Sequence, residues 1–140
     1  MKLKDLLNGL TVLSATADLD TEINDVSYDS RQTKPGDLFV AISGFAADGH
    51  KFIPMAAEKG AVCAVCEHEV DGIPYVVVED TRKALAVIGA NWFDHPACEM
   101  TMVGITGTNG KTTSTYLIKS ILEQKAGAKV GLIGTIQNMI

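Results

Sequence analysis

No other feature constrains the fold of this chain as strongly as the run GITGTNGKTT at residues 104–113. Residues 101–105 lead into it with an apolar stretch that predicts a strand, and the periodicity of residues 111–125 predicts a helix directly after it. A second strand is expected at residues 130–133. Residues 99–140 are therefore predicted to form a β-loop-α-β unit of the kind that opens a parallel sheet.

The loop in this unit has the composition of a phosphate-binding turn. Its glycines let backbone N–H groups approach an anion without a Cβ in the way, and the N-terminus of the following helix adds the positive end of its dipole. Lys111 supplies a full charge for outer phosphates, and the Thr112 hydroxyl is a candidate Mg²⁺ ligand. The common pattern G-x-x-x-x-G-K-[ST] requires glycine where this chain has Ile105, so the loop is a variant. A glycine-rich turn without a ligand is the alternative.

The first 98 residues alternate predicted strands with predicted helices, which indicates an α/β fold. Asp80 is a candidate helix cap, Gly60 a candidate helix end, and Asp48 with Gly49 is expected to shape a turn. The segment 94–99, around Pro96, breaks the pattern and predicts a boundary between domains 1–98 and 99–140. Strands are expected at 23–28, 38–42, 61–66 and 75–78, and helices from Leu3 to Leu10, at 50–59 and from 81 to about 93.

Composition excludes several classes of protein. The chain has 140 residues, 46% of them hydrophobic, and a net charge of −5, which excludes a disordered tail, a fibre and a basic nucleic-acid coat. Residues 1–98 carry 8 basic and 15 acidic side chains, whereas residues 99–140 carry 4 and 2. No apolar run approaches the roughly 20 residues that span a bilayer. We therefore expect a protein that binds no nucleic acid and inserts in no membrane. The odd number of cysteines makes the reducing cytoplasm the expected compartment.

The three cysteines argue against a disulfide framework, because their number is odd. Cys63 and Cys66 have C-x-x-C spacing, but they fall in a predicted strand, where residues three apart point to opposite faces. Core packing is therefore favoured over metal binding or redox chemistry.

The loop at residues 107–113 resembles the ATP loop of the Mur ligases and their folylpolyglutamate synthetase relatives. One branch of that family, the ligases that add a diamino acid, is also similar in four further motifs. These are SYDSR at 27–31, PGDLFVA at 35–41, DGH at 48–50 and GLIGT at 131–135. The sister branch, which adds a D-Ala-D-Ala dipeptide, shares part of this pattern and ranks second.

The resemblance implies an ATP- and Mg²⁺-dependent amide ligase of bacterial peptidoglycan synthesis. In that family a carboxylate of UDP-MurNAc-L-Ala-D-Glu is phosphorylated, and the amine of meso-diaminopimelate or L-lysine attacks the acyl phosphate. A small N-terminal α/β uridine-binding domain precedes the ATPase domain. By family position, the residues expected to contact the UDP end are Tyr28, Ser30, Phe45, Ala46 and Ala47. The residues expected to bind the ATP phosphates are Gly107, Thr108, Asn109, Gly110, Lys111, Thr112 and Thr113. Of these, Lys111 is expected to be catalytic and Thr112 to be a ligand of the metal ion.

Several alternatives stay open. Ser30 is also suited to a turn, and His50 to a structural or capping role. We expect the chain to be the N-terminal piece of a longer protein, because the single β-loop-α-β unit at 99–140 is too small for a closed core. The alternative is that this unit completes the sheet of the first domain. No acidic Mg²⁺ ligand, downstream catalytic lysine or amino-acid-selecting domain is found in the sequence. We therefore expect it not to catalyse ligation alone. A non-catalytic UDP-sugar-binding module and a general P-loop NTPase remain alternative functions.

Overall fold

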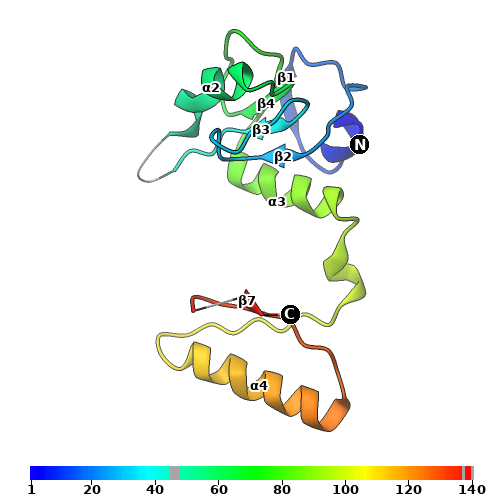
Figure 1. Ribbon diagram of the computed structural model, residues 1–140, viewed down its shortest axis with the longest axis vertical. Coiled ribbons are helices and arrows are strands. Elements are labelled where there is room, and N and C mark those ends of the chain that lie inside the picture. Colours follow the sequence, from blue (N-terminus) through cyan, green and yellow to red (C-terminus); the bar gives the residue numbers. More distant parts are fainter. Residues whose placement is uncertain (45–47, 137, 140) are drawn as a thin grey trace. The chain divides into compact units, whose positions relative to one another are not determined.

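The computed structural model describes residues 1–44, 48–136 and 138–139. The chain divides into two compact units, Met1–Glu99 and Met100–Ile140 (Figure 1). The first unit contains a five-stranded sheet and the second a helix with a two-stranded pair.

The sheet of the first unit has the strand order β1-β5-β4-β3-β2. Strands β2 to β5 run parallel, and β1 pairs antiparallel with β5 at one edge. This parallel sheet confirms the predicted α/β fold class. The strands are β1 (Val12–Ala15), β2 (Val26–Ser27), β3 (Leu38–Val40), β4 (Cys63–Cys66) and β5 (Tyr75–Val78).

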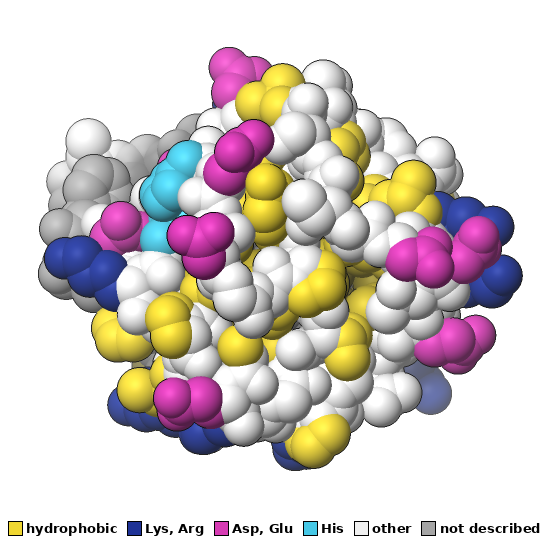
Figure 2. Space-filling view, turned by 90° about the horizontal axis from the view of Figure 1, so that it is seen from above, with side chains coloured by type: hydrophobic (Ala, Val, Ile, Leu, Met, Phe, Trp, Pro, Cys, Tyr) yellow, Lys and Arg dark blue, Asp and Glu magenta, His cyan; other side chains and the backbone are white. Residues whose placement is uncertain are grey.

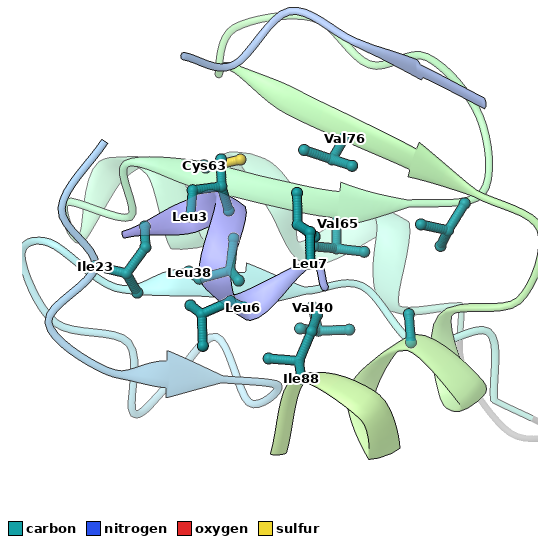
Figure 3. Close-up of a cluster of buried hydrophobic side chains, with 12 residues drawn as sticks. Leu3, Leu6, Leu7, Ile23, Leu38, Val40, Cys63, Val65, Val76 and Ile88 are labelled. Carbon is teal, nitrogen blue, oxygen red and sulfur yellow. The ribbon is translucent and has the colours of Figure 1, made fainter. Parts of the chain in front are cut away.

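Helices cover both faces of this sheet, because successive strand side chains point to opposite sides. On one face α1 (Leu3–Leu6) and α3 (Thr81–Trp92) pack against the strands (Figure 3). On the other face lies α2 (Ile53–Glu58), which follows the short 3₁₀ helix η1 (Gly49–Phe52). The first face buries Leu3, Leu6, Leu7, Ile23, Leu38, Val40, Cys63, Val65, Val76, Val78, Ala84 and Ile88. The second buries Phe39, Ala41, Ile53, Ala56, Ala61, Ala64, Cys66, Ile73 and Val77.

The two cysteines of the C-x-x-C spacing lie in different core clusters. Cys63 packs with the α1 and α3 face, and Cys66 with the α2 face. Burial raises the pKa of the Cys63 thiol to about 12 and that of Cys66 to about 11. The prediction that both serve core packing is confirmed.

The helix ends follow their local sequence. Asp80 caps α3, since its carboxylate accepts from the backbone N–H groups of Arg82 and Lys83 at 2.9 and 3.0 Å. Gly60 follows α2 with a φ of 97°, and a Cβ there would lie 2.9 Å from Cα of Pro35. Both predicted caps are confirmed.

The helix expected from Leu3 to Leu10 ends at Leu6. Two strands of the first unit also differ from expectation. Strand β1 was not predicted, because it is an edge strand with mostly exposed residues and a register shift between Val12 and Ser14. The strand expected at 23–28 pairs at Val26–Ser27 alone. Both strands lie at edges of the sheet, where fewer residues are buried and the sequence therefore shows little of the apolar pattern of a strand.

The second unit contains α4 (Lys111–Ala126) and the antiparallel pair of β6 (Leu132–Ile133) with β7 (Asn138–Met139). The helix and the strand at 132–133 agree with prediction. The prediction of a strand at 101–105 is wrong, because the structure, which describes all five of these residues, has no strand there. A strand exists through hydrogen bonds to a neighbour, and β6 instead pairs with β7, which was not predicted.

Candidate functional site

Two glycines shape the loop before α4. Gly107 has a φ of 146° and Gly110 a φ of 75°, both in the region that favours glycine. Gly110 is the N-cap residue of α4, and a Cβ there would meet no atom within 4 Å. The space beside the helix N-terminus is therefore open to a ligand.

Lys111 reaches across this loop. Its Nζ donates to the carbonyl oxygen of Gly107, which holds the ammonium beside the glycine turn. The amide of Ser114 donates to the Gly110 carbonyl at 2.9 Å and begins the regular hydrogen bonds of α4. Helix geometry gives the preceding amides no acceptor within the helix, so they are donors suited to an anion.

Lys111 and Thr112 line the same hollow, which has a volume of about 210 Å³. The hollow extends to Tyr116 on α4 and to Gly134 and Thr135 after β6. A lysine ammonium, a threonine hydroxyl and a helix N-terminus fit a phosphate group and its metal ion. The other five predicted phosphate ligands do not line this hollow; they are Gly107, Thr108, Asn109, Gly110 and Thr113.

The predicted uridine contacts differ in exposure. Ser30 is 6% exposed, and its hydroxyl donates to Sδ of Met55 at 3.4 Å. Tyr28 is 65% exposed and lines a separate hollow of about 480 Å³. Phe45, Ala46 and Ala47 lie outside the described residues. The structure thus places the Ser30 hydroxyl against α2 and the Tyr28 ring at the surface.

Asp29 and Arg31 form a local ion pair. Nε and Nη2 of Arg31 donate to the two carboxylate oxygens of Asp29 at 2.9 and 2.7 Å. These hydrogen bonds hold the pKa of Asp29 well below its usual range. Both residues line the hollow that contains Tyr28, so its rim carries paired charges.

A buried histidine connects the turns at the carboxyl edge of the sheet. Nδ1 of His50 lies 2.7 Å from Oδ1 of Asp48, and its Nε2 accepts from the backbone amide of Glu67 at 2.9 Å. The same Asp48 oxygen accepts from the His50 amide at 3.0 Å and caps η1. These bonds hold the pKa of Asp48 below its ordinary value. The structural role expected of His50 and the turn role of Asp48 are confirmed.

Glu67 was missed by sequence reasoning. Its Oε2 accepts from Oγ of Ser43 at 2.8 Å, and its Oε1 accepts from the amide and hydroxyl of Thr81 at 3.0 and 2.9 Å. Burial opposes ionisation, but the hydrogen bonds from Thr81 and Ser43 bring the pKa of Glu67 below its ordinary value. The sequence did contain one signal for Glu67, which is its position directly after a buried strand. Parallel strands end at the same edge of a sheet, so a polar residue there lies near the segments that follow the neighbouring strands.

The surface around this network is mixed in charge. Figure 2 shows histidine side chains gathered with acidic ones, and basic side chains spread around the rim of the same face. The rings of His50 and His68 stack at 4.3 Å between centroids. Across the described residues, no three His, Cys, Asp or Glu side chains gather as a metal site requires. None of the described helices has the length and apolar character to cross a membrane.

Two family models match this chain. The Mur ligase family, catalytic domain, matches residues 22–93, and the Mur ligase middle domain matches residues 105–140. The second match contains the loop before α4 and the whole of that helix.

Individual relatives give the same result. UDP-N-acetylmuramoyl-L-alanyl-D-glutamate--2,6-diaminopimelate ligase 1 of Clostridium acetobutylicum is 50% identical over 143 residues. The corresponding ligase of Clostridium tetani is 47% identical over 146 residues. Each alignment covers 100% of this chain and 30% of the relative, so the chain spans about a third of the length of these proteins.

Solved structures share the fold. MurF from Acinetobacter baumannii superposes with a TM-score of 0.68 at 31% identity, over 89% of this chain and 28% of that one. MurF from Thermotoga maritima in complex with ADP superposes with a TM-score of 0.55 at 28% identity, over 76% of this chain and 25% of that one. Since the catalytic-domain model alone covers more than half of the residues, the chain belongs to the Mur ligase family.

Proposed function

We propose that this chain carries the UDP-precursor-binding domain and the first part of the ATP-binding domain of a ligase of peptidoglycan synthesis. The ligase adds a diamino acid to UDP-MurNAc-L-Ala-D-Glu in the bacterial cytoplasm. Support comes from relatives at 47–50% identity whose names specify 2,6-diaminopimelate. Diaminopimelate is therefore proposed over L-lysine as the incoming amino acid.

The observation that carries this proposal is the placement of Lys111 and Thr112 on one hollow at the N-terminus of α4. In the proposed reaction Lys111 exchanges the Gly107 carbonyl for a phosphate oxygen and neutralises charge there. Gly107 and Gly110 leave room for the phosphate chain, and Thr108, Asn109 and Thr113 complete the loop. The Thr112 hydroxyl is proposed to hold Mg²⁺, which when bound supplies positive charge to the transferring phosphoryl group.

The first unit is proposed to bind the UDP end. Tyr28 offers an exposed ring, and Ser30 offers a hydroxyl whose present partner, a thioether sulfur, is a weak acceptor. A ligand oxygen competes well with such a partner. Phe45, Ala46 and Ala47 remain proposed contacts of the same ligand.

Titration of the 140-residue chain with ATP and Mg²⁺ tests the phosphate site. Lys111→Ala is expected to weaken ATP binding at least tenfold, because a charge-assisted hydrogen bond is lost. Lys125→Ala is the matched control, since it removes the same charge from the last turn of the same helix. Equal losses in both variants, or none in either, contradict the proposed site.

Titration with UDP-MurNAc-L-Ala-D-Glu tests the first unit. Ser30→Ala is expected to weaken binding about two- to tenfold, the effect of one hydrogen bond, with little change in thermal stability. Unchanged affinity with a lower melting temperature would instead make Ser30 a structural residue that serves Met55.

The D-Ala-D-Ala-adding ligase is the second candidate. The solved structures named MurF favour it, although at 31% identity against 50% for the diaminopimelate ligase. Preferential binding of the UDP-MurNAc-tripeptide over the dipeptide precursor would reverse the order of the two candidates.

A further inference from the structure

Lys119 joins helix α4 to the chain that follows it. Its Nζ donates to the carbonyl oxygen of Val130 at 2.7 Å and to Oε1 of Glu123 at 2.6 Å. The Lys119 side chain is only 14% exposed, and its bond to Val130 is partly buried, whereas its bond to Glu123 is exposed. Because an exposed ion pair contributes little, the bond to Val130 is the one that ties the two segments together.

Lys119 lies on the face of α4 that lines the hollow beside the phosphate-binding loop. Thr112, Thr115 and Tyr116 line that hollow from the helix. Lys119 follows Tyr116 by three positions, which is the spacing of neighbours on one helix face. Its ammonium therefore meets the following chain about one turn beyond the hollow.

After α4 the chain reverses and runs back toward the N-terminal end of the helix (Figure 1). The reversal begins at Gly127, the C-cap residue, which has a φ of 60°. Residues 132–135, here called the return wall, line the hollow together with α4. In this wall Leu132 is 7% exposed and Ile133 is 87% exposed, so β6 turns one face inward.

The bond at Val130 determines how far along α4 the return wall lies. From Lys119 back to Lys111 the helix rises about 12 Å, at about 1.5 Å per residue. From Val130 to Gly134 an extended chain advances about 13 Å, at about 3.3 Å per residue. Because the two lengths agree, this bond brings Gly134 level with Lys111, and both residues line the hollow. A slip of one residue would displace Gly134 by about 3.3 Å and turn the buried Leu132 outward.

We propose that Lys119 is a positioning residue for the phosphate site: its bond to Val130 fixes the register of β6 on α4 and so presets the return wall beside the phosphates. This inference rests on the proposed function and adds a residue that does not itself line the hollow. A wall that is fixed in advance raises affinity, because less ordering remains to be done on binding.

The test titrates the 140-residue chain with ATP and Mg²⁺. Lys119→Met keeps the apolar stem and loses the ammonium, so it is expected to raise the dissociation constant about fivefold. Lys119→Arg keeps a charged donor and is expected to recover most of the affinity. Lys119→Gln shortens the side chain by one bond and loses the charge, so a loss of about twofold is expected. This milder variant keeps the test usable if Lys119→Met does not fold.

Two control variants separate the bond to Val130 from the charges around it. Glu123→Gln removes the ion pair and leaves the Lys119 ammonium bound to Val130, so unchanged affinity for ATP is expected. Lys125→Met removes the same charge as Lys119→Met from the last turn of the same helix, and unchanged affinity is again expected. Weakening by either control as large as that by Lys119→Met overturns the inference, because charge would then explain the effect.

Amide resonances supply a readout that a general loss of stability does not imitate. In the wild-type chain, ATP with Mg²⁺ is expected to shift the amide resonances of Thr112 and Gly134, because both residues line the hollow. In Lys119→Met at saturating ATP, the Thr112 amide is expected to shift as before and the Gly134 amide far less. This difference reports the return wall separately from the helix N-terminus.

The outcomes distinguish the inference from the proposed function. The inference is wrong, and the proposed function stands, if Lys119→Met and Lys119→Gln bind ATP as tightly as the wild-type chain. The same holds if Lys119→Arg loses as much affinity as Lys119→Met, or if the Gly134 amide responds to ATP alike in wild type and Lys119→Met. If the wild-type chain binds no ATP, the proposed phosphate site is itself wrong, and the inference fails with it.

Discussion

The backbone amide of Glu67 donates to Nε2 of His50 at 2.9 Å, and this bond decides where the imidazole proton sits. Nε2 must be the unprotonated nitrogen, so Nδ1 carries the proton and donates to Oδ1 of Asp48 at 2.7 Å. A buried neutral ring thereby joins the residue after β4 to the cap of η1. The geometry leaves no spare hydrogen-bonding nitrogen on His50 for a ligand.

His50→Ala is expected to lower the free energy of unfolding by about 2–4 kcal/mol, because two hydrogen bonds and a buried ring are lost together. Urea denaturation followed by circular dichroism measures this difference. His68→Ala is the control, since that exposed ring contributes the stacking contact with His50. Similar losses in the two variants would show that ring stacking, and not the link from Asp48 to Glu67, stabilises this edge.

The network also predicts the response to acid. The pKa of Glu67 and that of Asp48 lie below their ordinary values, so the folded chain favours both carboxylates in the ionised form. As the pH falls through the ordinary carboxyl pKa, at about pH 4, these carboxylates take up protons in the unfolded chain before they do so in the folded chain. The stabilisation is therefore complete at neutral pH and is lost as the pH falls through the lowered folded values. Glu67→Gln is expected to show a smaller loss of stability between about pH 5 and pH 3 in urea titrations. A wild-type slope in that variant would mean that Glu67 contributes nothing to acid sensitivity.

The elements that could be predicted from the sequence are mainly those whose residues are buried, because burial leaves an apolar pattern along the chain. Strands β3, β4 and β5 are short apolar runs with buried residues, and their prediction needed no tertiary information. The loop before α4 was equally readable, because only its glycines permit the φ values of Gly107 and Gly110. Glu67 carries no such pattern, since its importance comes from Ser43 and Thr81, which lie 24 and 14 residues away. Strand β1 was not predicted for a different reason. Its residues are mostly exposed, so its sequence lacks the apolar pattern that marks a buried strand.

The thiols are expected to differ sharply in reactivity. The thiolate is the nucleophile, and burial raises the pKa of Cys63 to about 12 and that of Cys66 to about 11. Cys98 is exposed. At about pH 8 the folded chain should show one fast-reacting thiol with a disulfide reagent, and the remaining thiols should react after unfolding. Cys98→Ser should abolish the fast phase. Rapid reaction of that variant would show that the sheet exposes Cys63 or Cys66 far more often than their burial implies.

The end of α3 contains a conformation better suited to glycine. The amide of His95 donates to the carbonyl of Ala90 at 2.7 Å, and that of Asp94 donates to Asn91 at 3.3 Å. These two bonds form a Schellman motif, in which the residue at the Asp94 position adopts a left-handed conformation. Asp94 does so with a φ of 56°, and the Cβ makes this conformation unfavourable.

Asp94→Gly is therefore expected to raise the free energy of unfolding of the first unit by about 0.5–1 kcal/mol, because relief of the left-handed strain exceeds the entropy that glycine adds to the unfolded chain. Asp94→Ala keeps the Cβ and loses the polar side chain that tolerates this region, so it is expected to lower stability. Urea midpoints of the two variants, compared with wild type at neutral pH, measure the difference. If both substitutions shift the midpoint in the same direction, removal of the Asp94 charge decides the effect, and the backbone conformation at the end of α3 does not.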